Sequence, residues 1–484
     1  MRRSLVVLAL TPLAAAALAA PARAQERPFG TLREQAAVQQ QWLARRLETV
    51  LPELMRKHGV TTWVVPMREY NEDPVFSSLV APTTFAARRR TIYVFHDRCA
   101  GETAGARPSA LGARPAGADP ADARPSARDP LSCIERLALG GTSQGGLYEA
   151  VRATKTVEAD VRGRQAELWG DEQWQVLRKV LEERDPPRIA IDVSSDFAFG
   201  DGLSAGELEG MKRGIGERLA ARLVPAGLLP VELIARRLPE EEATFAEMNR
   251  LAWEIIRTAF SRAVITPGTT RTDDVVWWMR QRVNDLGLGS WFQPSIDVQR
   301  RGVSASELGE NPVILPGDVL HCDFGLVAMR LTTDTQHMAY VPREGESSAP
   351  AGLERAFAAG NRLQDIVVEE LRPGRTGNEI LAAARARMAR EGIDGTIYSH
   401  PIGMHGHGAG PLVGLWDYQD GVPGRGDAPV LAGMWYSIEL QATSPVAEWD
   451  GQRVRMALEE DVIVDATGRV RWAHARQTSL HLVR

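Results

Sequence analysis

Residues 317–334 read GDVLHCDFGLVAMRLTTD, and this stretch decides how the carboxy-terminal part of the chain folds. From Val313 onward the apolar residues follow a period of two, which predicts β-strands. Asp323 lies near the end of the first expected strand, and Asp334 follows eleven residues later. Two strands joined by a hairpin would bring these carboxylates together. Because aspartates at strand ends more often cap turns, the pair alone does not define a site.

A second stretch, residues 400–410, reads HPIGMHGHGAG and holds three of the nine histidines within eight residues. Its glycines allow close backbone approach and leave the imidazoles accessible. A lone histidine is more often an ordinary core or surface residue. A cluster in a glycine-rich segment favours metal ligands.

Two further acids, Glu439 and Glu459, lie in apolar segments that read as strands, WYSIE and LEEDVIV. A buried carboxylate is costly unless it is paired or binds a metal. Four such acids and a histidine make a mostly oxygen site with enough negative charge for two divalent ions.

The order of these motifs resembles the pita-bread metallopeptidase family, which includes methionine aminopeptidase, aminopeptidase P and prolidase. The resemblance runs from about residue 235 to residue 484, and residues 40–232 look like the amino-terminal domain of aminopeptidase P and prolidase. It implies an α/β amino-terminal domain followed by an α+β pita-bread (creatinase/aminopeptidase) catalytic domain.

The resemblance also implies a role for each residue. His407 fits the family motif Gly-His-Gly-x-Gly as the histidine ligand, although His405 is an alternative. Glu439 would also accept the proton of the attacking water, and His400 or His405 would stabilise the tetrahedral oxyanion. Mn²⁺ is the predicted ion, with Zn²⁺, Co²⁺ and Fe²⁺ as alternatives. The implied ligands of two divalent ions are Asp323, Asp334, His407, Glu439 and Glu459.

The chain departs from the family pattern in ways that bear on its substrate. No histidine occurs between His96 and His321, where the family has a substrate-binding histidine. The family's Glu-Pro-Gly reads Glu439-Leu440-Gln441, and its later His-Glu or His-Asp pair reads Trp416-Asp417. His337 stands where the family has an arginine, and Glu460 takes the place of a neighbouring acid. These changes keep the metal ligands and leave specificity for Xaa-Pro bonds open.

The first residues predict a signal peptide over residues 1–24. Arg2 and Arg3 precede an apolar run that ends in an Ala-x-Ala site, so cleavage is expected after Ala24. Cleavage removes three arginines and changes the net charge from −5 to −8. We expect a periplasmic or secreted protein without stable membrane insertion, and both Sec and Tat export stay open.

Composition sets wider limits. The 484 residues are 44% hydrophobic and 25% charged, an ordinary globular balance. The net negative charge provides no basic field for nucleic acid. Residues 100–130 form an insertion rich in Ala, Pro and Gly that is expected to be flexible. Cys99 and Cys133 flank it, either as two separate thiols or as a disulfide that export would favour, while Cys322 is expected to stay reduced.

Local patterns place the regular elements. Strands are expected at residues 61–65, 91–95 and 189–193, and helices at residues 43–57, 171–184, 272–283, 353–371 and 377–391. The leading hypothesis is an exported dinuclear peptidase that hydrolyses short peptides from the amino terminus, as an Xaa-Pro aminopeptidase or dipeptidase, with a homodimer as a further expectation. The alternatives are a catalytically silent protein that binds peptides or partners, and a metal-free relative like creatinase. The retained acids argue against both.

Overall fold

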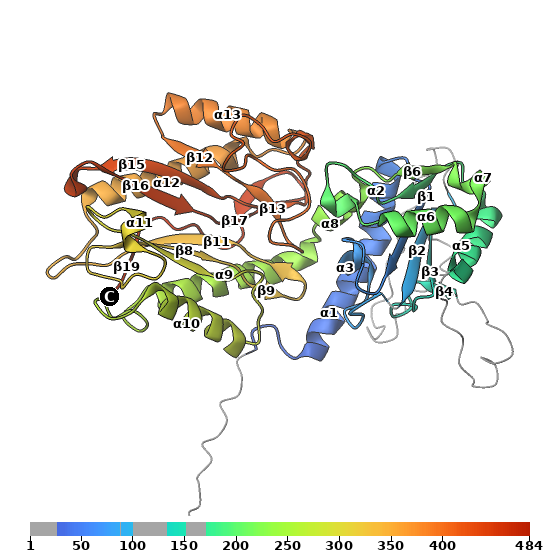
Figure 1. The fold of residues 1–484 in the computed structure, drawn as a ribbon, viewed down its shortest axis with the longest axis horizontal. Helices are drawn as coiled ribbons and strands as arrows, with labels where there is room; N and C mark the ends of the chain where they lie inside the picture. Colours follow the sequence, from blue (N-terminus) through green and yellow to red (C-terminus); the bar gives the residue numbers. More distant parts are fainter. Residues whose placement is uncertain (1–26, 88, 100–132, 152–170) are drawn as a thin grey trace, which may run out of the picture.

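The computed structural model of the chain describes residues 27–87, 89–99, 133–151 and 171–484 (Figure 1). The predicted signal peptide and the predicted insertion at residues 100–130 therefore lie outside the described residues. Among the helices of the described ranges, none is both long and apolar enough to cross a bilayer.

The amino-terminal domain is built on one mixed sheet with the strand order β4-β3-β2-β1-β5-β6. Alternate side chains of β1 enter two different cores: Trp63 and Val65 pack with the first helices, and Val64 packs with α5 and α6. Both faces of the sheet are thus covered, as in an α/β domain. The strands are β1 (Thr62–Arg68), β2 (Arg90–Asp97), β3 (Ile134–Leu139), β4 (Glu149–Val151), β5 (Ile189–Ile191) and β6 (Leu223–Pro225).

The helices of this domain follow local signals closely. The α-helix α5 (Asp171–Arg184) has the predicted bounds, and α6 (Ala205–Ile215) lies beside it. The first helix begins earlier than the expected residue 43, because Thr31 caps α1 (Leu32–Arg45) in a reciprocal pair with Glu34. A π-helical turn, Arg46–Val50, joins α1 to α2 (Leu51–Lys57).

Cys99 and Cys133 form a disulfide with a Cα–Cα distance of 5.4 Å, which confirms the second of the two expectations for these thiols. They lie just after β2 and just before β3, so the bond joins the ends of two paired strands. Cys322 is free and buried, as expected.

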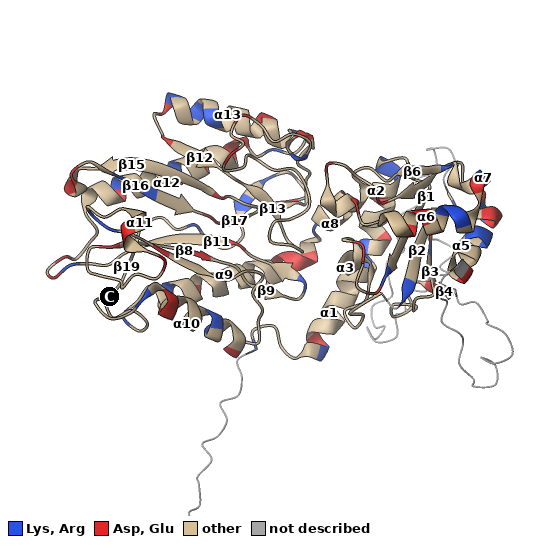
Figure 2. Cartoon of the chain, in the orientation of Figure 1, with Lys and Arg blue, Asp and Glu red and all other residues tan. Residues whose placement is uncertain are grey.

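The carboxy-terminal domain places its strands between two pairs of helices (Figure 1). The first pair is α9 (Glu242–Ala259) and α10 (Thr272–Asp285), and the second is α12 (Ala351–Glu370) and α13 (Gly377–Arg390). Helix α9 packs on β8 and β11, and α12 packs on β15 and β16. Figure 2 shows acidic and basic residues interspersed along the outer helices of both domains.

Three sheets of this domain bring distant segments together. The orders are β19-β11-β8-β7, β12-β15-β16 and β13-β14-β17-β18. The bounds are β7 (Ser295–Gln299), β8 (Val319–Phe324), β9 (Val327–Ala328), β10 (Leu331–Thr332), β11 (Thr335–Tyr340), β12 (Gly395–Ile397), β13 (His400–Ile402), β14 (Trp435–Ser437), β15 (Leu440–Val446), β16 (Gln452–Leu458), β17 (Asp461–Val464), β18 (Val470–Trp472) and β19 (His481–Leu482).

Buried polar contacts fix the amino-terminal domain to the carboxy-terminal one. Arg46 forms a buried ion pair with Glu241 at 2.9 Å, and its guanidinium also donates to the carbonyl of Leu233. From the other side, Arg330 donates to the carbonyls of Ser77 and Val80. Because a charge left unpaired in this position would be costly, these contacts specify one arrangement of the two domains.

Candidate metal centre

Strand pairing brings four acids to one point. Antiparallel β8 and β11 set Asp323 opposite Gln336, and Asp334 immediately precedes β11. Gln336 and Glu459 exchange both backbone hydrogen bonds at 3.1 Å, which attaches the end of β16 to the same place. Glu439 joins the cluster from the short turn between β14 and β15.

His400 lies at the centre of these acids. It begins β13 and pairs with Ser437 of β14, and its side chain is 0% exposed. Its Nε2 lies 3.2 Å from Glu459 Oε1, 3.7 Å from Glu439 Oε2 and 3.8 Å from Asp334 Oδ2. Its Nδ1 lies 3.0 Å from the carbonyl of Pro401. A carbonyl only accepts, so Nδ1 carries a proton and Nε2 is the nitrogen available to an ion.

The structure places the three clustered histidines in different surroundings. His407 is an exposed residue, and its ring lies 4.9 Å from the ring of His400 and 5.1 Å from Trp291. His405 instead faces the amino-terminal domain, with its ring 4.9 Å from Phe199. The strand β13 holds His400 inside the cluster, whereas His405 and His407 stand in the loop that follows. The structure therefore adds His400 to the candidate ligands, and His407 stays a candidate on the exposed side of the cluster.

The donor atoms fall into overlapping groups, each with atoms within 4.8 Å of one another. One group is His400, Glu439 and Glu459, and a second is Asp323, Asp334 and Glu459. Asp334, His400 and His407 form a third. The first two groups share Glu459. All five residues expected as ligands belong to these groups.

The pKa values of the acids are those expected of a cation site. Burial raises the pKa of Asp323 to about 7, and the charge of Glu459 adds to the shift. Burial and the charge of Glu459 also raise the pKa values of Asp334 and Glu439 well above their ordinary range. Buried oxygens of Asp323 and Asp461 have no hydrogen-bond partner. Divalent cations would bind the unpaired oxygen of Asp323 and offset the repulsion among the acids, so the residues of the groups fit such ions. Asp461 belongs to none of these groups.

Three residues that sequence analysis missed complete the cluster. Gln336 donates to Glu439 and Glu459, Ser437 donates to Glu459 at 2.7 Å, and His321 contacts Gln336. Each stands two residues from a predicted ligand, the spacing that puts side chains on the same face of a strand. This spacing could have indicated the three residues from the sequence, because a polar side chain next to a metal ligand on one face of a strand often hydrogen-bonds to that ligand and orients it.

Glu460 and His337 lie on the opposite face of their strands. His337 Nε2 is 2.9 Å from Glu460 Oε1, and Trp253 of α9 donates to the other oxygen of Glu460 at 3.0 Å. Burial raises the pKa of Glu460 to about 8 and lowers that of His337 to about 3. Neither belongs to the cation groups, so they anchor α9 behind the site.

Residues 247–466 match the model of metallopeptidase family M24, and this range contains every residue of the cation groups. The domain belongs to metallopeptidase family M24. A search of curated proteins found no match.

Solved structures share the fold of both domains with this protein. The X-Pro aminopeptidase of Thermotoga maritima is 13% identical, with a TM-score of 0.57, and the match covers 89% of this chain and 100% of that one. The Xaa-Pro dipeptidase of Bacillus anthracis is 15% identical, with a TM-score of 0.52 and coverages of 92% and 100%. The amino-terminal domain of a FACT complex subunit from Cicer arietinum (chickpea) is 10% identical, with a TM-score of 0.55 and coverages of 92% and 99%. At these identities the likeness shows the pita-bread fold alone.

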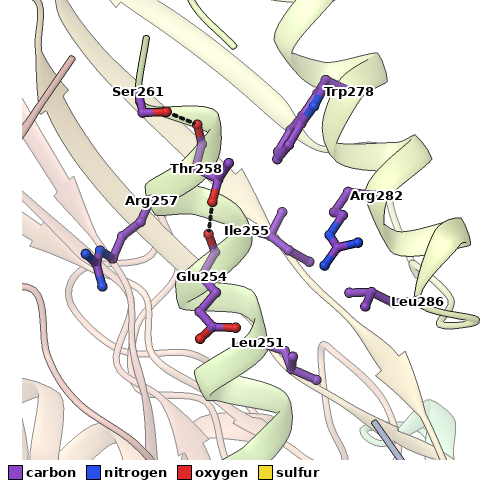
Figure 3. A pocket seen from close by; sticks show the side chains of 9 residues that line it. All are labelled: Leu251, Glu254, Ile255, Arg257, Thr258, Ser261, Trp278, Arg282 and Leu286. Atoms are coloured by element: carbon purple, nitrogen blue, oxygen red, sulfur yellow. Dashed lines mark hydrogen bonds between the residues drawn. The ribbon is translucent and has the colours of Figure 1, made fainter. Parts of the chain in front are cut away.

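A separate groove of about 610 Å³ lies between α9 and α10 of the M24 domain (Figure 3). Leu251, Ile255 and Trp278 supply apolar surface, and Glu254 and Arg282 supply charge. None of its lining residues belongs to the cation groups. The chemistry of the protein is therefore assigned to the acids and His400.

Proposed function

We propose that this protein is an exported, dinuclear metal-dependent peptidase that releases residues from the amino terminus of short peptides, as an Xaa-Pro aminopeptidase or dipeptidase. The observation that carries the proposal is the position of His400 Nε2, 3.2–3.8 Å from three buried carboxylates. A buried cluster of this kind is costly to keep without cations.

The two cation positions follow from the groups of donor atoms. His400, Glu439 and Glu459 would hold one ion, and Asp323, Asp334 and Glu459 would hold the other. The oxygen-rich donor set suits Mn²⁺, with Zn²⁺, Co²⁺ and Fe²⁺ as alternatives. When bound, such ions lower the pKa of a water and polarise the peptide carbonyl.

Side chains of the protein would transfer the protons and orient the reacting groups. Glu439 is placed to accept a proton from the attacking water and to return it to the leaving amine, because its Oε2 faces His400 while Gln336 holds its Oε1. His407 takes over the role expected for His400 or His405. From the entrance it would donate to the carbonyl oxygen as negative charge develops there.

Aromatic residues surround this entrance. The ring of Tyr398 lies 5.3 Å from His400, 5.8 Å from His407 and 5.7 Å from Trp416, whose side chain is partly exposed. The ring of Trp291 lies 5.1 Å from that of His407. We infer that apolar side chains of the peptide substrate bind against these aromatic rings. The site would therefore accept a peptide with a bulky apolar residue, and it would not require proline at the second position of the peptide.

Export is supported by the predicted signal peptide and by the Cys99–Cys133 disulfide, since disulfides persist in oxidising compartments. The periplasm or the exterior is the proposed location.

The test is a panel of short peptides, with and without proline at the second position, incubated with protein in Mn²⁺ and in chelator. Amino-acid release should require metal, and Glu439→Gln should abolish it, because the amide cannot accept the proton. Robust release in chelator would contradict the proposal. No release by wild-type protein that holds both ions would support a silent peptide-binding protein instead.

A further inference from the structure

Gln336 occupies a position in the cluster that the metal ligands alone do not explain. It is 4% exposed and stands on β11, on the same face as Asp323 of the paired strand β8. Its Nε2 donates to Glu439 Oε1 at 2.6 Å and to Glu459 Oε2 at 2.8 Å. One amide group therefore holds one oxygen of each glutamate.

The remaining oxygens of the two glutamates face His400. Glu439 Oε2 lies 3.7 Å from His400 Nε2, and Glu459 Oε1 lies 3.2 Å from it. Ser437 also donates to Glu459 Oε1, at 2.7 Å. Gln336 thus divides the four carboxylate oxygens into two that are bonded to its amide and two that are presented with the histidine.

A second contact fixes the orientation of the amide itself. Ionised carboxylates, the form that binds cations, only accept, so the nitrogen of Gln336 faces them and its Oε1 points away. His321 Nε2 lies 2.9 Å from that oxygen, and His321 Nδ1 lies 3.1 Å from Asp297 Oδ2. Asp297 is on β7, so β7, β8 and β11 each contribute one member to this chain of contacts.

We propose that Gln336, oriented by His321, is a positioning residue that rotates Glu439 and Glu459 into the geometry in which one oxygen of each binds a divalent cation beside His400. The proposal rests on the proposed function, because it assumes that this cluster binds cations. Groups that orient metal ligands from behind typically change metal affinity by about 10–100-fold when removed.

The experiment measures binding of Mn²⁺ alone to metal-free full-length protein by isothermal titration calorimetry. Gln336→Met keeps the length of the side chain and removes the donors, so Mn²⁺ should bind about 10–100-fold more weakly. The matched control is Gln299→Met on β7, because Gln299 contacts no acid of the cluster: it donates to the backbone carbonyl of Arg455 at 2.7 Å and accepts from the N–H of Arg455 at 2.9 Å. The affinity of the Gln299→Met variant for Mn²⁺ should stay within about twofold of that of wild type.

Circular dichroism of each metal-free variant separates positioning from folding. A merely structural role would lower the melting temperature without weakening Mn²⁺ binding by the folded fraction. His321→Leu is a second variant. It keeps the N–H donors of Gln336 but removes the histidine that fixes the orientation of the amide. The affinity of this variant for Mn²⁺ should fall by on the order of 10-fold. This variant carries the test if Gln336→Met does not fold. Wild-type affinity in either folded variant would overturn the proposal, whereas failure of the wild-type protein to bind Mn²⁺ would instead overturn the proposed function.

Discussion

His400 and His407 are seven residues apart in sequence but stand in different surroundings, and substitution should separate their roles. His400 is 0% exposed among three carboxylates, whereas His407 stands at the entrance beside Trp291. We expect His400→Ala to weaken Mn²⁺ binding at least about 10-fold, because a ligand is lost and the acids remain. We expect His407→Ala to bind Mn²⁺ like wild type and to lower kcat on a short peptide by about 100-fold. Calorimetry and steady-state kinetics check both, and the assignment is wrong if His407→Ala is the variant that loses metal.

The sequence could predict the acids of the site but not which histidine joins them. The period-two pattern around Asp323 and the apolar segments before Glu439 and Glu459 are local signals. His407 matched the family motif better than His400 did, and only the pairing of His400 with Ser437 shows which ring is buried. Gln336 was within reach of sequence analysis, because it follows Asp334 at strand spacing.

At the scale of elements, the disulfide joins the ends of β2 and β3 across a sequence separation of 34 residues. Closing a loop of this length stabilises a fold by about 3–4 kcal/mol in the chain-entropy model. The double variant Cys99→Ser with Cys133→Ser should lose about that much free energy of unfolding in urea and should keep its Mn²⁺ affinity, because the bond lies in the other domain. An unchanged urea midpoint would contradict this expectation. Cys322→Ser does not serve as a control for the loss of a cysteine, because Cys322 is buried and directly precedes Asp323 of the cation groups, so its substitution could disturb the site itself.

Most elements were predictable from local patterns, and the exceptions have physical reasons. The helix α5 and the strands β1, β2 and β8 follow apolar periodicity and breakers. The strand β16 was not predicted, although Arg453 and Arg455 alternate with the buried Val454 and Met456 in the period of two that is typical of a half-buried strand. Its place is set by pairing with β15, which no local signal encodes. The order of strands in the three larger sheets of the M24 domain likewise depends on contacts between distant segments.

For the whole molecule, the buried acids predict how stability without metal depends on pH. Burial raises the pKa of Asp323 to about 7 and that of Glu460 to about 8, and it raises those of Asp334 and Glu439 well above their ordinary range. The folded state therefore binds more protons than the unfolded state at neutral pH. Stability contributed by these protons is therefore lost as pH rises. The buried histidines act in the opposite direction, but only below about pH 6.5, because His405 and His407 have folded pKa values of about 4.

Between about pH 6.5 and 8, above the titration of the histidines and up to the pKa of Glu460, the acids should therefore dominate, and the melting temperature of metal-free protein should fall. Asp334→Asn should reduce the slope, because an amide does not titrate. Saturating Mn²⁺ should also flatten it, because the ions bind the ionised acids. Differential scanning calorimetry at several pH values measures this, and a melting temperature of metal-free protein that rises over the same range would be inconsistent with an acid cluster of this kind.

The central claim is that the acids and His400 form the working centre of a dinuclear peptidase. The measurement that tests it most directly is the rate of amino-acid release from a short peptide as Mn²⁺ is added, in known equivalents, to metal-free protein. Activity should be absent at the start, rise with added metal and level off near two equivalents per chain, as expected for two cations that share Glu459. Activity without metal, or none after two equivalents are shown to be bound, would contradict the claim.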